Sequence, residues 1–233
     1  MNNIQLQIKI KERLNKLASM DYDNIECWQI AEAFNKAQIS FVRRQVHGVN
    51  QTKEGDESTK VLIDDLQCLL TEQPLTGANG TVYFESSNLP DNYLFYKSVT
   101  ASSKTDCCPD RRLVVYLAPV ADVTNLLFDQ LRSPSAEWGE TFCTLIDNKV
   151  RIYHDGKFQV VLPKLTYYRN PLNVQFDGCV DLATGQTSTV DVECEFKDDV
   201  AELIVDEAAS ILAGDMESVL QYQRTKTTST ENN

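Results

Sequence analysis

The chain has 233 residues, a net charge of −12, a hydrophobic share of 42% and a charged share of 24%, the composition of a globular protein. No run approaches the roughly eighteen consecutive apolar residues of a transmembrane helix. The acidic balance also argues against a protein that binds nucleic-acid phosphates through clustered Lys and Arg.

The N-terminal third is predicted to be helical. Residues 1–22 are expected to form a helix or an arm, with Ile4, Ile8 and Leu14 on one face. A helix is predicted from about residue 25 to 46, because apolar residues recur every three or four positions there. The sequence "VLIDDLQCLL", residues 61–70, predicts a short helix that ends at Pro74.

The middle of the chain is rich in β-branched and aromatic residues, which is typical of strands. Strands are expected within "TVYFES", "YLFYKSVTAS", "RRLVVYLAPV" and "TSTVDVECEF". "DVTNLLFDQLRS", residues 122–133, predicts a short helix. Asp155-Gly156 supplies the positive φ angles of a tight turn, so residues 148–163 predict a β-hairpin.

The C-terminal region predicts a long amphipathic acidic helix over residues 198–220, followed by a polar tail at 225–233 that is disordered or docks on a partner. Residues 191–217 hold ten acids and one base, a net −9. The element order predicts an α+β fold with N-terminal helices and an antiparallel sheet with hairpins. We expect residues 23–224 to form a single domain.

The sequence shows no pattern for catalysis. It has no nucleophile elbow, zinc-protease motif or phosphate-binding loop. The seven cysteines are odd in number and widely spread, which argues for a reducing cytosol and against a disulfide framework. Adjacent Cys107 and Cys108 lack zinc-site spacing and are interpreted as loop thiols, with a role that the sequence does not define. We therefore predict no catalytic, metal-binding or cofactor-binding residues, and no enzyme.

The terminal helix is the strongest functional candidate. It either packs on its own sheet or presents its apolar stripe to another helix. The candidate assembly-interface residues are Trp28, Phe34, Phe41, Leu203, Ile204, Ile211, Leu212, Val219 and Tyr222. The acids on its polar side are Glu202, Asp206, Glu207, Asp215 and Glu217.

Six segments in order resemble the head–tail connector ring proteins of tailed bacteriophages, in particular the first ring below the portal in crAss-like phages. They are "WQIAEAFNKAQISFVRRQ", "VLIDDLQCLL", "LPDNYLFYKSV", "SPSAEWGETFCTL", "LTYYRNPLNV" and "VAELIVDEAASILAGDMESVLQYQ". The specificity lies in the series, since no single segment is a mechanistic motif.

The resemblance implies a non-enzymatic virion protein, made in the host bacterial cytoplasm. It would form a twelvefold-type ring between the portal protein and the next connector or tail ring. The genome would pass through without specific binding, and the five acids named above would face the channel. Two alternatives remain: a monomeric acidic adaptor or nucleic-acid mimic, and an enzyme that uses two of the acids.

Overall fold

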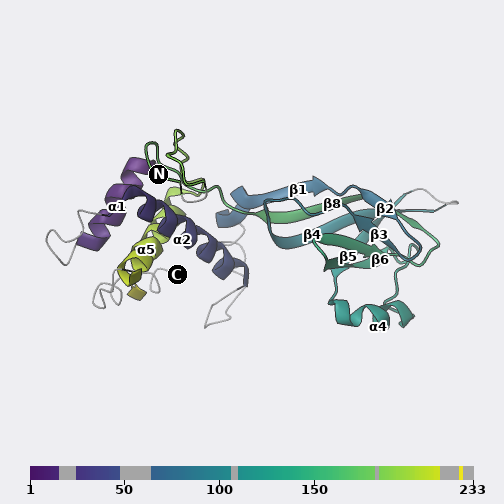
Figure 1. The fold of residues 1–233 in the computed structure, drawn as a ribbon. Coiled ribbons are helices and arrows are strands. Elements are labelled where there is room, and N and C mark those ends of the chain that lie inside the picture. Colours follow the sequence, from purple (N-terminus) through teal and green to yellow (C-terminus); the bar gives the residue numbers. More distant parts are fainter. Residues whose placement is uncertain (16–24, 48–63, 106–109, 182–183, 216–225, 228–233) are drawn as a thin grey trace. The chain divides into compact units, whose positions relative to one another are not determined.

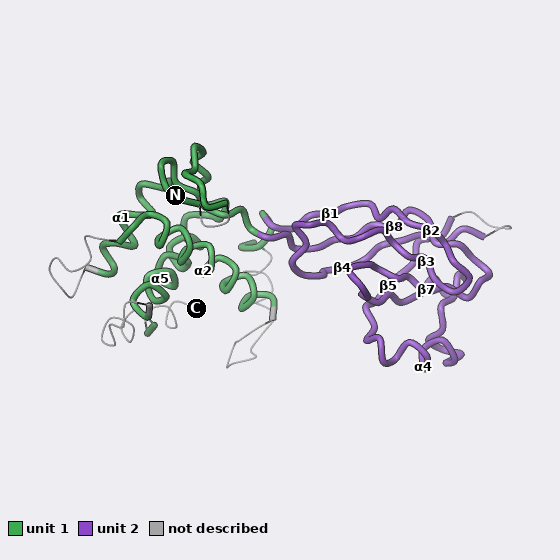
Figure 2. Tube along the Cα trace, in the orientation of Figure 1, with its two compact units in different colours: residues 1–68, 171–233 green, residues 69–170 purple. Residues whose placement is uncertain are grey.

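The computed structural model describes residues 1–15, 25–47, 64–105, 110–181, 184–215 and 226–227 (Figure 1). The chain divides into two compact units (Figure 2), in place of the single domain expected over 23–224. Unit 1 comprises residues 1–68 and 171–233, and unit 2 comprises residues 69–170. The mixed α+β class is confirmed, but helices dominate unit 1 and strands dominate unit 2.

Unit 1 is built on three helices: α1 (Asn3–Asn15), α2 (Cys27–His47) and α5 (Asp198–Asp215). Helix α5 packs against both α1 and α2. Its small residues Ala201, Ala208 and Ala209 are fully buried, which lets the neighbouring helices approach closely. The α5 stripe is therefore used within its own unit, against helices and not against a sheet.

The buried face of α1 differs from the prediction. Leu6, Ile10 and Leu14 are fully buried, whereas Ile4 and Ile8 point to solvent. Both sets have helical spacing, so periodicity alone could not decide which one faces the core.

Unit 2 contains an eight-stranded sheet in the order β1-β8-β4-β5-β6-β7-β3-β2. The strands are β1 (Leu70–Pro74), β2 (Gly77–Asn79), β3 (Tyr83–Ser86), β4 (Tyr93–Lys104), β5 (Arg111–Leu117), β6 (Glu140–Ile146), β7 (Lys149–Tyr153) and β8 (Gln159–Arg169). Neighbours are antiparallel except β5 and β6, which are parallel. The expectation of a purely antiparallel sheet is corrected at this pair.

The sheet curls until its two ends approach each other. Only Leu75 and Thr76 separate β1, at one end, from β2, at the other. The Asn79 side chain links β2 to β8, since its Nδ2 donates to the Val160 carbonyl (3.0 Å) and its Oδ1 accepts from the Val160 amide (3.0 Å). Gly77 is required here because a Cβ would lie 2.1 Å from the Glu85 carbonyl oxygen.

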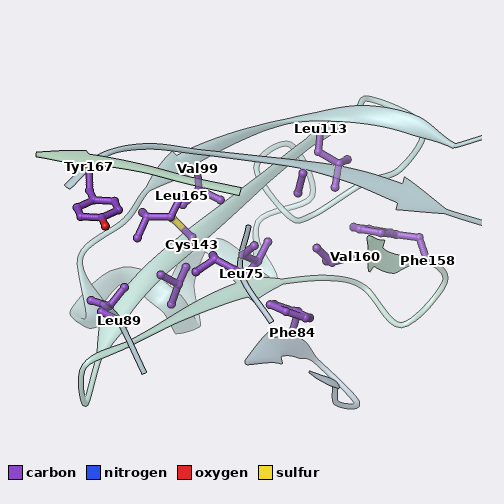
Figure 3. Close-up of a cluster of buried hydrophobic side chains, with 13 residues drawn as sticks. Leu75, Phe84, Leu89, Val99, Leu113, Cys143, Phe158, Val160, Leu165 and Tyr167 are labelled. Atoms are coloured by element: carbon purple, nitrogen blue, oxygen red, sulfur yellow. The ribbon is translucent and has the colours of Figure 1, made fainter. Parts of the chain in front are cut away.

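A buried core fills the curled sheet (Figure 3). It includes Leu75, Phe84, Val99, Leu113, Cys143, Ile152, Val160, Leu165 and Tyr167. A second cluster joins Phe142 and Tyr153 to Val123, Leu126 and Leu127. It attaches the short segment η2 (Val120–Asp122) and helix α4 (Val123–Phe128) to the sheet.

Three local predictions are wrong. Strands β7 and β8 flank Asp155-Gly156 but do not pair, and the tight turn is at Asp147-Asn148 between β6 and β7, where both residues have positive φ. Residues 70–74 form strand β1 and not the end of a helix, after the 3-10 turn η1 (Gln67–Leu69). Residues 187–196 contain isolated bridges, Val192 to Gln175 and Thr187 to Val180, where a strand was expected.

Candidate functional site

Helix α2 presents a polar and aromatic face to solvent. Trp28, Glu32 and Lys36 lie four residues apart along it, and all three line hollows on both sides of the helix. The larger hollow, about 390 Å³, lies between α2 and residues 173–181 and 188. The smaller, about 220 Å³, lies between α2 and the end of α5, where Ile211 lines it. The predicted residues Trp28 and Ile211 thus belong to one surface region.

The wall opposite α2 is held by side chains of unit 1. The Asn35 Nδ2 donates to the Val174 carbonyl (3.1 Å), and the Val174 amide donates to the Asn35 Oδ1 (2.7 Å). The Asn3 Nδ2 donates to the carbonyls of Gln175 (2.9 Å) and Val192 (3.1 Å). Asparagine side chains therefore hold this irregular wall in place by hydrogen bonds to its backbone amide and carbonyl groups.

A disulfide between Cys27 and Cys179 ties the same wall to the start of α2. The two Cα atoms are 6.0 Å apart, although 152 positions separate the residues in sequence. This bond corrects the expectation of unpaired cysteines. Cys143 and Cys194 are free thiols, and Cys107 and Cys108 lie outside the described residues.

The predicted interface residues separate into several environments. Phe34, Phe41 and Ile204 are buried in the core of unit 1. Leu203 is half-buried on α5, and the largely buried Leu212 lines the smaller hollow together with Ile211. Val219 and Tyr222 lie outside the described residues. Within the described chain, the interface hypothesis therefore rests on Trp28, Leu203, Ile211 and Leu212.

Three of the five acids predicted to face a channel form ion pairs inside unit 1. Glu202 pairs with Lys9 and with Arg13 (2.7 Å), and Asp206 also pairs with Arg13. Glu207 pairs with Arg44 and accepts a hydrogen bond from the Ser40 hydroxyl (2.6 Å). These acids join α5 to α1 and α2. The side chain of Asp215, and all of Glu217, lie outside the description.

Unit 2 carries large exposed apolar side chains that the sequence interpretation missed. Phe128, Leu131 and Trp138 are 84%, 89% and 74% exposed, and Val114 and Val120 are also exposed. The Tyr116 hydroxyl donates to the Arg132 carbonyl (3.4 Å), which connects β5 to the segment carrying the aromatic residues. A signal was present at Trp138, a large apolar residue between Glu137 and Gly139 in a polar loop.

The interior of unit 2 contains two titratable groups whose pKa values are raised. The Tyr96 hydroxyl lies 3.6 Å from the Cys143 Sγ. Burial raises the pKa of Tyr96, and burial raises the pKa of the Cys143 thiol to about 11, so neither group ionises near neutral pH. A thiol that stays protonated is a poor nucleophile. Among the described residues, no group of three or more His, Cys, Asp or Glu could hold a metal ion.

Comparison of the sequence with models of protein families and with curated proteins gives no match. In the described part of the chain, no helix combines the length and apolarity needed to cross a membrane.

Proposed function

We propose that the protein is a non-enzymatic structural component that assembles with copies of itself, as a ring in a phage head–tail connector. The observation that carries the proposal is the exposed apolar surface on both units. Isolated exposed apolar residues are ordinary, but grouped ones mark contact surfaces. Unit 2 exposes Phe128, Leu131 and Trp138 within eleven consecutive residues, and unit 1 places Trp28 between two hollows.

The net charge differs between the two units, which supports different roles for them in the proposed ring. Unit 1 holds 23 acidic and 12 basic residues, a net −11, whereas unit 2 holds 11 and 10, a net −1. A nearly neutral apolar surface suits protein contacts, because it costs little electrostatic repulsion between copies. A strongly acidic surface beside a genome would prevent phosphate binding and let DNA pass.

The portal protein and a neighbouring connector ring are the other partners of this proposal, and the virion is the proposed location. The test is negative-stain imaging and light scattering of the full chain, alone and with a purified portal protein of the resembled phage group. Rings in either sample support the proposal. Monomers in both samples overturn it.

One observation favours the acidic adaptor as a second candidate: nearly all the net charge lies in unit 1. An adaptor of this kind would bind a basic partner, with an affinity that falls steeply as salt rises. The apolar assembly proposed above would keep its oligomeric state between low and high salt. Light scattering over a salt series separates the two.

A further inference from the structure

Helix α1 carries an exposed apolar ridge on the side that faces away from the core of unit 1. Ile4 and Ile8 are 71% and 60% exposed, one turn apart, and Lys11 continues the same face. We call these three residues the α1 ridge. The opposite face of the helix is already packed, since Leu6, Ile10 and Leu14 are fully buried. Neither Ile4 nor Ile8 lines either of the two hollows beside α2.

The same unit carries an apolar groove of matching character. The larger hollow beside α2 is lined by Trp28, Ala31, Ile39, Phe176, Cys179 and Val180, and we call these six residues the α2 groove. Trp28, Ala31 and Ile39 are half-buried and Val180 is exposed, so the groove is open to a ligand. The disulfide and the Asn35 pairing fix its far wall, so little conformational entropy is lost on docking.

The charges of the two surfaces are opposite. The part of residues 171–196 that lines the groove contains one acid, Asp181, and no Lys or Arg. Of the three basic residues of helix α1, Lys9 and Arg13 pair with acids of α5, and Lys11 lies on the ridge. At the groove itself, Glu32 and Asp181 are acidic and Lys36 is basic. An apolar ridge that continues into a lysine is therefore the complementary occupant, and α1 supplies one on every copy.

We propose that the α1 ridge of one copy seats in the α2 groove of the next copy. This inference rests on the self-assembly proposed above and names its contact. The two surfaces are different patches of one unit, so the contact is heterologous. Such a contact leaves a free ridge and a free groove at the ends of any chain of copies, and it stops only when a ring closes.

Two variants and one control test the contact in the full chain. Ile4→Asp/Ile8→Asp disables the ridge, and Ala31→Arg/Val180→Lys fills the groove and reverses its charge. Val190→Asp is the matched control, because Val190 is exposed in the same segment but lines neither hollow. Far-UV circular dichroism verifies that each variant folds. Light scattering measures the oligomeric state of each variant alone and of an equimolar mixture of the two.

Each variant alone is expected to be monomeric, with self-association weakened at least about 100-fold, since two buried isoleucines are lost or blocked. The mixture is expected to form dimers and nothing larger, because only one working ridge and one working groove remain per pair. The Val190→Asp control should assemble like the wild type. Wild-type assembly by folded variants, or a mixture that stays monomeric, would overturn the contact but not the proposed ring. A wild type that stays monomeric both alone and with the portal protein would overturn both.

A measurement on the wild type covers the case in which a variant does not fold. Carbodiimide cross-linking of a mixture of isotopically light and heavy chains should join Lys11 of one isotope to Glu32 or Asp181 of the other. Cross-links between copies that never involve α1 would contradict the proposal.

Discussion

Removing the Cys27–Cys179 disulfide should destabilise unit 1 by several kcal/mol, through the entropy of the unfolded chain. The bond closes a loop of 152 positions that contains all of unit 2. If the entire loop unfolds, the loop-entropy relation gives about 5 kcal/mol. If unit 2 stays folded, the effective loop is shorter, because Leu70 pairs with Tyr168 and the two ends of unit 2 are adjacent. About 50 flexible residues then remain, which corresponds to about 4 kcal/mol.

The assay is urea unfolding followed by the helical circular dichroism signal, for the wild type, Cys27→Ser/Cys179→Ser and the control Cys68→Ser. The double variant should unfold at a lower urea concentration, and reductant should shift the wild type and the Cys68→Ser control to meet it. Reductant should leave the double variant unchanged. Peptide mapping by mass spectrometry without reductant should find the peptides of Cys27 and Cys179 joined. The reasoning is refuted if mapping shows the bond broken while the wild-type midpoint stays where it was.

Four further outcomes are expected. Phe142→Ala should cost unit 2 about 3–5 kcal/mol in denaturant unfolding, because the ring is fully buried, whereas Val114→Ala on the surface should cost almost nothing. Arg13→Met should lower the free energy of unfolding by about 1–3 kcal/mol, since it leaves the buried Asp206 without its guanidinium, while Arg43→Met at an exposed position should change it little. Burial lowers the pKa of His154, so the unfolded chain binds a proton there more readily than the folded chain does. Unit 2 should therefore lose stability as pH falls below about 6.5. Urea unfolding at a series of pH values should show that the free energy of unfolding depends less on pH in His154→Gln than in the wild type. Leu162 has a φ of 50°, a left-handed conformation in which a β-branched side chain is more strained than leucine, so Leu162→Val should lower the thermal midpoint, whereas Leu162→Asn should not.

Local sequence signals identified most of the elements. The apolar period of residues 25–46 corresponds to α2, and the strand-rich segments correspond to β3, β4 and β5. Acids at 198 and 199 correctly marked the start of α5, because carboxylates there suit the helix N-terminus. These features depend on neighbours within a few positions, which a single sequence displays.

Features that depend on distant partners could not be predicted. Asp155-Gly156 permits a tight turn, but the partner of β7 is chosen by the core, and the turn before it at Asp147-Asn148 forms the hairpin. Similarly, nothing local pairs Cys27 with Cys179, since their approach depends on how residues 171–196 pack on α2. The acids of α5 look solvated in sequence, yet Glu202, Asp206 and Glu207 pair with bases from α1 and α2.

The pairing of β1 with β8 makes unit 2 an inserted domain whose first and last strands are neighbours. Its entry and exit lie side by side, and the polypeptide of unit 1 continues on both sides of the insertion. A short glycine-rich linker joining residue 68 to residue 171 could therefore replace the insert without straining the helices. Insertions of this kind can be exchanged or diversified by recombination while the helical host keeps its own contacts.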